Sequence, residues 1–226
     1  MEYVEEQYKV NTRKMKKIEK EFIIKNTKWI ILFICLIGFL SLAEDVFNKE
    51  IMTGDIIGYK MVSTFLISDF ATPIAKFITN LGGAIFLIGL TALLIILIKN
   101  KKIGLSILAN LAIVTGLNQL LKRILQRPRP TEFRIVEETG YSFPSGHSMV
   151  SMAFYGYLIY LIYKYVENKY AKWCLICLLS CLIISIGTSR IYLGVHYTSD
   201  VLGGFLISIS YLVIYISAVN KFLTER

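Results

Sequence analysis

Residues 77–98, FITNLGGAIFLIGLTALLIILI, form an uncharged and almost wholly apolar run. Because a helix needs about 20 apolar residues to cross the hydrocarbon core of a bilayer, this run is long enough to span a membrane. Further apolar runs alternate with short charged stretches, which is the pattern of a polytopic membrane protein; they cover residues 29–42, 103–121, 149–163, 173–188 and 201–219. The sequence therefore predicts an all-α fold, an integral membrane bundle of six transmembrane helices.

Composition supports one membrane domain. Of the 226 residues 55% are hydrophobic and the mean hydropathy is +0.57, which is rare in a soluble domain. The runs 29–42 and 149–163 are short, so we expect both helices to extend into interfacial residues. Residues 1–28 mix acids and bases, unlike a signal peptide, and we interpret them as a charged cytoplasmic N-terminal arm before a membrane domain over 29–226.

The net charge of +9 follows from topology rather than from nucleic acid binding. With six spans and both termini in the cytoplasm, sixteen Lys and Arg residues lie inside and nine outside, and six of those nine belong to the loops that carry the three motifs described below. This distribution follows the positive-inside rule once the motifs are set aside. We therefore expect a multi-pass protein of the cell membrane whose motifs face outside.

The segment between the first two apolar runs and the cysteines can also be interpreted from the sequence. Residues 46–76, interrupted by Gly54, Gly58 and Pro73, are expected to form an outer loop with short interfacial helices. The loop is either a simple connector, which we favour slightly, or a cap that gates lipid entry. The cysteines, three of them spaced helically at 174, 177 and 181, are interpreted as small packing residues rather than metal or redox ligands.

The first motif runs from Lys122 to Arg129-Pro130, just after the span 103–121. Lysine offers a point charge, and arginine offers a planar fork that suits phosphate oxygens. By itself the pair could equally be cations that snorkel to the membrane surface. Asn118 lies one turn before Lys122, where it either orients that lysine or makes an ordinary hydrogen bond between helices.

The second motif is Pro144-Ser145-Gly146-His147, directly before the span 149–163. Gly146 lets the backbone come close to a ligand, and a serine beside a helix N-terminus favours an anion. His147 is placed to give a proton to a leaving oxygen. The structural alternative is an N-cap made by Ser145 with an incidental histidine.

The third motif is Ser189-Arg190, followed by His196 and Asp200. His196 and Asp200 are four residues apart, so they share one face if that segment is helical. A carboxylate that holds one imidazole nitrogen fixes the tautomer and leaves the other nitrogen as a nucleophile. Arg190 adds a third cation, and the alternative is a structural His–Asp bond that closes a helix.

The three motifs together resemble the type-2 phosphatidic acid phosphatase family, also called lipid phosphate phosphatases. Its signature is Lys-x6-Arg-Pro, then Pro-Ser-Gly-His, then Ser-Arg-x5-His-x3-Asp, and residues 122–200 match it without departure. These motifs contain the only two histidines of the chain, and the expected topology brings all three to one membrane face. The Lys- and Ile-rich composition with short loops is typical of bacterial members.

The resemblance implies a role for each motif residue. His196 is the nucleophile that becomes a phosphohistidine, Asp200 orients it, and His147 protonates the leaving oxygen and then activates water. It assigns phosphate binding to Lys122, Arg129, Ser145, Gly146 and Arg190. No metal and no cofactor are expected.

The substrate is expected to be a lipid phosphate or pyrophosphate in the bilayer, with undecaprenyl pyrophosphate as the leading candidate. Phosphatidylglycerol phosphate and phosphatidic acid are the others.

Arg123, Arg127 and Arg134 either hold a second phosphate or, as we favour, form a basic rim. The alternatives are a lipid phosphotransferase and a non-catalytic lipid-phosphate binder or transporter. The related vanadium haloperoxidases lack such spans, and the sequence does not indicate an oligomeric state.

Overall fold

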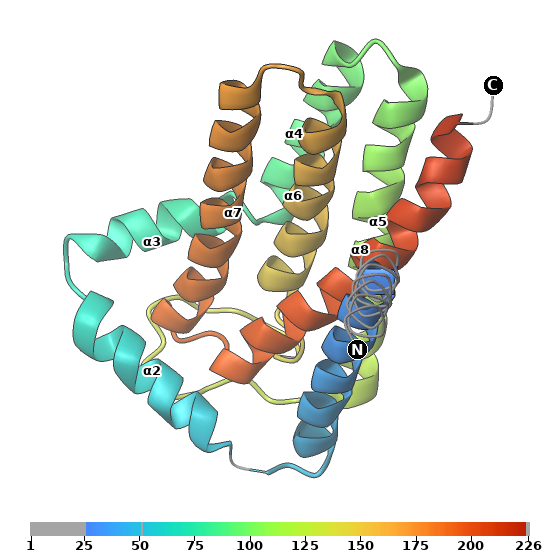
Figure 1. The fold of residues 1–226 in the computed structure, drawn as a ribbon. Coiled ribbons are helices and arrows are strands. Elements are labelled where there is room, and N and C mark those ends of the chain that lie inside the picture. The colour runs from blue at the N-terminus through green and yellow to red at the C-terminus, as the bar shows by residue number, and fades with distance from the viewer. Residues whose placement is uncertain (1–25, 51, 225–226) are drawn as a thin grey trace, which may run out of the picture.

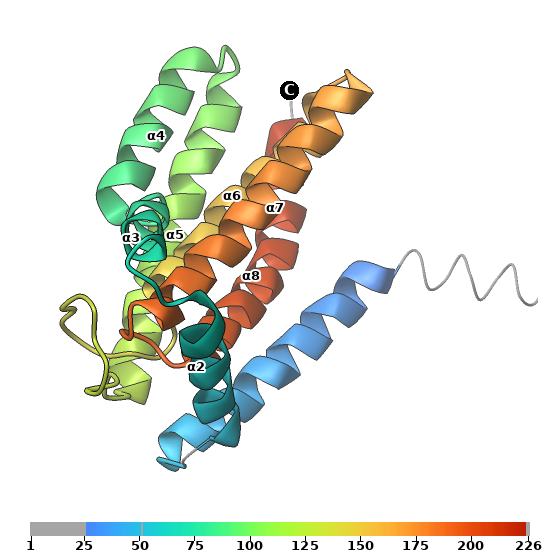
Figure 2. The same cartoon turned by 90° about the vertical axis from the view of Figure 1, so that its left-hand side faces the viewer.

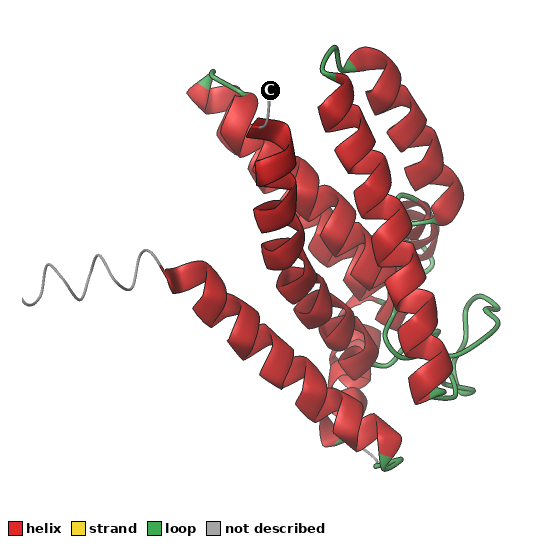
Figure 3. Ribbon diagram, turned by 90° about the vertical axis from the view of Figure 1, so that its right-hand side faces the viewer, coloured by secondary structure: helices red, strands yellow, loops and turns green. Residues whose placement is uncertain are grey.

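The computed structural model describes residues 26–50 and 52–224, and within them it contains helices and loops without a strand (Figure 3). Most of the expected N-terminal arm lies outside the described residues. The elements are an N-terminal helix Asn26–Phe47, α2 Thr53–Leu66, α3 Ala71–Asn80, α4 Ala84–Leu97, α5 Lys101–Leu125, α6 Gly146–Tyr165, α7 Lys169–Tyr192 and α8 Thr198–Thr224. The predicted all-α class is confirmed.

Helix α6 forms the centre of the bundle and packs against α5, α7 and α8 (Figure 1). Its residues Phe154, Tyr155 and Tyr157 are buried, and the hydroxyl of Tyr157 shares a hydrogen bond with Ser106 of α5 at 2.7 Å. Helix α4 packs against α5, and α3 packs against α7. The N-terminal helix runs beside α8 near the motif end of the bundle and leans away from it at its other end (Figure 2).

Four of these helices are long and apolar enough to cross a membrane, and the bent pair α3–α4 makes a fifth if it counts as one span. The four are the N-terminal helix, α5, α7 and α8. The predicted span 149–163 lies in α6, which does not reach that hydropathy. The reason is its central position: because other helices cover it, α6 can carry Ser148, Ser151 and several tyrosines, which a helix facing lipid would avoid.

The predicted span over residues 77–98 is not one continuous helix. The chain breaks between α3 and α4, and the two helices meet at an angle of 51°. The break is fixed by contacts with the core, since the Tyr155 hydroxyl donates a hydrogen bond to the Leu81 carbonyl at 2.6 Å. A Cβ on Gly82 would lie 2.6 Å from Ser151 Oγ, so only glycine fits at this close approach.

Residues 46–76 contain more helix than expected. Helix α2 occupies 14 of them, and α3 begins at Ala71 and takes in Pro73. Proline is tolerated there because the first turn of a helix leaves its N–H groups without partners in the helix. Helix α2 packs against both α7 and α8, so this segment covers the motif end of the bundle and is not a simple connector.

The ends of the long helices follow local chemistry. Asn100 and Asn168 cap α5 and α7, each accepting a backbone hydrogen bond of 3.0 Å. Helix α5 stops at Gln126, whose φ of +46° is left-handed, just before Arg127-Pro128.

The interpretation of the cysteines as packing residues is wrong for the three in α7. They are exposed on the surface of the bundle and do not pack inside it.

Candidate active site

All three motifs come together at one end of the bundle, where the loop 126–145 and the turn 193–197 lie side by side (Figures 1 and 2). Lys122 lies in the last turn of α5, and Ser145 caps α6. Arg190 lies in the last turn of α7, and Asp200 lies in the first turn of α8. The ends of four helices therefore position the residues that the sequence singled out.

His196 and Asp200 form the pair that the i, i+4 spacing indicated. The distance from His196 Nδ1 to Asp200 Oδ2 is 3.2 Å, and both side chains are almost wholly buried. The same carboxylate oxygen accepts hydrogen bonds from the Ser142 hydroxyl at 2.5 Å and the Tyr197 backbone N–H at 2.8 Å. Asp200 is thus held rigidly beside the imidazole.

Arg129 lies on the other side of the His196 ring. Its Nη1 is 3.0 Å from His196 Nε2 and also donates to the Val195 carbonyl, while the rest of the guanidinium donates to carbonyls of the loop 139–140. Since arginine only donates, Nε2 must be the acceptor, and the proton of the neutral ring lies on Nδ1, facing Asp200.

The charge state of His196 follows from this environment. Burial, together with the charges of Arg129 and Arg190 and opposed by the hydrogen bond and charge of Asp200, lowers its pKa from 6.5 to about 4. The imidazole is therefore neutral at physiological pH. A neutral ring with its lone pair on Nε2 is the form that can attack phosphorus.

Arg129 and Arg190 are bridged by a carboxylate that the sequence did not indicate. Glu138 Oε1 lies 2.5 Å from Arg190 Nη2, and its Oε2 lies 3.8 Å from Arg129 Nη2. Burial raises the pKa of Glu138, but the charge and hydrogen bond of Arg190, with the charge of Arg129, outweigh it and hold the pKa below its ordinary value. Arg190 also donates to Thr79 Oγ1 of α3 at 2.7 Å.

The second motif packs directly onto α5. Lys122 Nζ donates to the Tyr141 carbonyl at 2.9 Å, so the lysine faces the same loop as Arg129. A Cβ on Gly146 would lie 3.9 Å from Lys122 Nζ and 3.1 Å from Asn118 Oδ1, which explains the glycine at this helix start. The Asn118 amide donates to the Pro144 carbonyl at 3.2 Å. Asn118 therefore anchors the second motif and does not orient Lys122.

His147 lies in the first turn of α6, against the break between α3 and α4. A Cβ on Gly82 would be 3.5 Å from its Cδ2, and a Cβ on Gly83 would be 3.8 Å from its Nε2. The two glycines therefore let the α3–α4 break approach the imidazole. The side chain of Ser145 accepts hydrogen bonds from Ser148, so it acts as the N-cap that the sequence offered as an alternative role.

The three further arginines do not form a second phosphate site beside the first. Arg123 is exposed, and Arg134 donates to the Pro130 carbonyl. Arg127 is mostly buried and ion-paired to two carboxylates, those of Asp55 and Asp200. It is therefore not part of a basic rim either.

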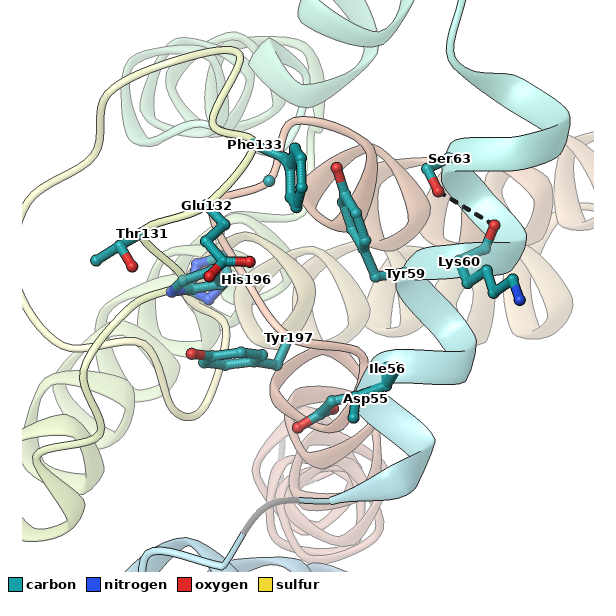
Figure 4. Close-up of a pocket in the computed structure, with 12 residues that line it drawn as sticks. Asp55, Ile56, Tyr59, Lys60, Ser63, Thr131, Glu132, Phe133, His196 and Tyr197 are labelled. Atoms are coloured by element: carbon teal, nitrogen blue, oxygen red, sulfur yellow. Dashed lines mark hydrogen bonds between the residues drawn. The ribbon is translucent and has the colours of Figure 1, made fainter.

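A pocket of about 530 Å³ opens beside His196 (Figure 4). One wall is the face of α2 that carries Ile56, Tyr59 and Lys60, and the opposite wall is the loop 130–133. The rings of Tyr59 and Phe133 stack across the pocket with their centroids 5.7 Å apart. The pocket places apolar side chains next to His196, which suits a ligand with an apolar part beside its reacting group.

Sequence reasoning missed four residues that contact the motif side chains. They are Asp55 and Thr79 on α2 and α3, and Glu138 and Ser142 in the loop before α6. No motif contains them, and each makes a contact with a residue more than 50 positions away along the chain.

Comparison with known proteins identifies the family of this chain. The model of the PAP2 superfamily matches residues 103–223. Phosphatidylglycerophosphatase B of Bacillus subtilis is 30% identical over 172 residues, 74% of this chain and 84% of the relative. The undecaprenyl-diphosphatase of Sulfolobus acidocaldarius is 28% identical over 205 residues, 84% of this chain and 91% of the relative.

Solved structures show the same arrangement of helices. The crystal structure of a transmembrane PAP2 type phosphatidylglycerolphosphate phosphatase from Bacillus subtilis has a TM-score of 0.77 and 27% identity, covering 86% of this chain and 98% of that one. Aquifex aeolicus LpxE has a TM-score of 0.56 and 21% identity, covering 70% and 92%, and shows the fold alone. The chain therefore belongs to the PAP2 superfamily and is a multi-pass membrane phosphatase.

Proposed function

We propose that this protein hydrolyses a membrane lipid phosphate or pyrophosphate through a phosphohistidine at His196, without a metal. The observation that carries the proposal is the state of His196, whose Nδ1–H faces Asp200 while its Nε2 lone pair faces the cation Arg129. A merely structural His–Asp bond does not explain why the second nitrogen faces a cation that is also suited to phosphate. A nucleophile that must meet a phosphoryl group requires that arrangement.

The reaction proceeds in two displacements. The phosphoryl oxygens take over the Arg129 hydrogen bond and free the lone pair of His196 Nε2, which attacks phosphorus. The bond from phosphorus to the lipid oxygen breaks, and protonated His147 gives its proton to the departing oxygen. Neutral His147 then takes a proton from water as the water oxygen attacks phosphorus. The phosphorus–nitrogen bond breaks, and inorganic phosphate leaves. Asp200 stabilises the positive charge that His196 carries while it is phosphorylated.

The cations would stabilise the phosphoryl oxygens in both steps. Arg190 is 2% exposed, and within the described residues its Nε has no hydrogen-bond partner, so one buried donor is left for a ligand oxygen. Lys122, Arg129 and the N-terminal backbone of α6 at Gly146 complete the proposed cradle. A substrate would take the place of the Glu138 carboxylate on the guanidinium of Arg190.

The membrane arrangement that we propose has six spans, with α6 as the central one and α3–α4 as one bent span. An α6 of 20 residues is about 30 Å long, which matches the hydrocarbon core. The positive-inside count supports cytoplasmic termini and an active site at the outer face. At that face a head group reaches the site while its chains stay in the bilayer.

Undecaprenyl pyrophosphate is the leading substrate in this proposal, because its head group is presented at the outer face and one relative is named for that activity. Phosphatidylglycerol phosphate is the next, since other relatives are named for it. Phosphatidic acid is the third. The pocket between α2 and the loop 130–133 supports a substrate with an apolar part next to its phosphate.

Phosphate release by the detergent-purified protein in excess EDTA tests the proposal, with the three lipids as a panel. His196→Ala should abolish release, whereas Arg123→Gln, an exposed charge at the end of the same helix as Lys122, should retain it. A substrate ³²P label that stays on the protein through alkali but is lost in acid would identify the phosphohistidine. Release that persists in His196→Ala, or that stops in EDTA and returns with a divalent metal, would refute the mechanism.

A further inference from the structure

Arg127 belongs to the same loop as Arg129, but its side chain points away from the phosphate cradle. Its Nη1 donates to Asp200 Oδ1 and its Nη2 donates to Asp55 Oδ2, both at 2.6 Å. Its guanidinium also lies over the Tyr197 ring, 4.1 Å from the centroid. The side chain is 11% exposed. A phosphate could reach this arginine only by displacing a carboxylate that already has good geometry.

Asp55 joins α2 to the start of α8. Besides the ion pair with Arg127, its carboxylate accepts hydrogen bonds from the Ser199 backbone N–H at 2.7 Å and the Ser199 hydroxyl at 2.9 Å. Asp55 thus caps α8 from another helix and compensates one of the N–H groups that a helix start leaves without a partner. Burying a carboxylate is costly unless hydrogen bonds compensate for the lost water. The three donors around Asp55 provide that compensation.

The two carboxylate oxygens of Asp200 have different hydrogen-bond partners. Oδ1 is held by Arg127, whereas Oδ2 faces His196 Nδ1, the Ser142 hydroxyl and the Tyr197 backbone. Without Arg127, the carboxylate could rotate and lose its alignment with the imidazole. Asp200 accepts the Nδ1 proton while Arg129 donates to Nε2, so a correctly aligned Asp200 acts together with Arg129 to keep the lone pair on Nε2.

We propose that Asp55 and Arg127 are positioning residues that hold Asp200, and through it His196, in the reactive geometry. Neither residue touches the phosphoryl group. Helix α2 is then part of the catalytic framework, because it carries the carboxylate that fixes Arg127 and caps α8. This inference rests on the proposed function of His196 as the nucleophile.

Close packing supports a fixed position for α2. A Cβ on Gly58, one turn after Asp55, would lie 2.1 Å from Thr198 Oγ1, so glycine lets α2 touch the first residue of α8. The contact is therefore steric as well as ionic. It keeps the Asp55 carboxylate within reach of both Arg127 and Ser199.

The first test reads the tautomer of His196 directly. The chain has only two histidines, so ¹⁵N-histidine labelling of an untagged His147→Gln protein leaves one imidazole to observe. In that protein the spectrum should show a neutral ring protonated on Nδ1. In the Arg127→Gln and Asp55→Asn variants the Nδ1-protonated population should fall, whereas the exposed-site controls Arg123→Gln and Asp69→Asn should keep it. A tautomer that stays unchanged in both Arg127→Gln and Asp55→Asn would overturn the inference.

The second test separates positioning from binding by steady-state kinetics in otherwise unchanged protein. Arg127→Gln and Asp55→Asn should lower kcat about 10- to 100-fold, as losses of supporting contacts around a reactive group do, with KM changed less than about threefold. Arg127→Lys, which reaches one carboxylate only, should fall between Arg127→Gln and wild type. A raised KM with unchanged kcat would instead make Arg127 a substrate-binding residue and overturn the inference.

A double variant tests whether the two residues act together. If Asp55 acts through Arg127, adding Asp55→Asn to Arg127→Gln should cost less than the product of the two single effects. Effects that multiply fully would overturn the coupling. The tautomer measurement needs no substrate, so it remains decisive even if wild type released no phosphate from any lipid, an outcome that would refute the proposed function instead.

Discussion

At the scale of single residues, the environment of His196 controls the chemistry. Its lowered pKa, about 4, means that the neutral ring persists from neutral pH down into mild acid. In the ¹⁵N-labelled His147→Gln protein, we therefore expect the Nε2 resonance to titrate near pH 4 and not near the ordinary value of 6.5. The sign follows from burial and two nearby arginines, which all disfavour the imidazolium. A midpoint near 6.5 would show that the ring is solvated and that the buried geometry does not hold.

Ser142 offers a second test at this scale. Its hydroxyl donates to Asp200 Oδ2 at 2.5 Å, and hydrogen bonds to charged groups contribute about 1.5–3 kcal/mol. Ser142→Ala should lower kcat about tenfold, because the carboxylate loses one of the donors that fix it. Ser180→Ala is the control, since that hydroxyl donates to the Ile176 carbonyl within its own helix, α7. Equal kcat values for the two variants would show that Ser142 does not hold Asp200.

The residues that the sequence could predict share a local signature, and those it could not predict have none. Lys122, Arg129 and the His196–Asp200 pair were found because they belong to short motifs that together match a family signature. Glu138 and Asp55 were not, because their partners Arg190 and Arg127 lie 52 and 72 residues away along the chain. Only tertiary packing brings such pairs together, and a single sequence does not contain that information.

At the scale of elements, the break between α3 and α4 shows where hydropathy misleads. The run 77–98 is apolar throughout, so composition alone favours one helix. The contacts of Leu81 and Gly82 with α6 decide otherwise. Conversely, α6 has less of the apolar character of a span because the other helices cover it. Hydropathy indicates which helices contact lipid. It misleads at the α3–α4 break and at α6, because both face other helices of the protein.

Gly82→Ala tests the role of that break. The added Cβ would lie 2.6 Å from Ser151 Oγ and 2.7 Å from Ile186 Cγ2, so α3–α4 must move away from the core beside His147. We expect a loss of about 1–3 kcal/mol in stability, as for other overpacked sites, and a lower kcat. Gly89→Ala on α4 is the matched control, because its Cβ meets nothing within 4 Å. Its Tm should stay the same or rise, since alanine favours helix.

Comparable Tm and kcat values for Gly82→Ala and Gly89→Ala would show that the break accommodates a methyl group and does not support His147. The comparison is fair because both substitutions add the same atom to the same pair of helices. Thermal unfolding in detergent, followed by tryptophan fluorescence, reports the stability of each variant beside wild type.

At the scale of the whole molecule, the proposed six-span arrangement depends on whether α6 crosses the membrane. The loop containing Glu132 precedes α6 and the turn containing Glu167 follows it. If α6 crosses, these residues lie on opposite sides of the bilayer. If the positive-inside count sets the orientation, Glu132 lies outside with the active site and Glu167 lies in the cytoplasm.

Single-cysteine variants measure this directly in intact cells. The four native cysteines are free thiols, so they are first replaced by alanine, and Glu132→Cys or Glu167→Cys is then introduced. A membrane-impermeant maleimide should label Glu132→Cys in intact cells and Glu167→Cys only after permeabilisation. The reverse pattern would place the active site in the cytoplasm and remove presentation at the outer face as the reason to favour undecaprenyl pyrophosphate. Labelling of both variants from the same side would mean that α6 does not cross, since one crossing helix must separate its two ends.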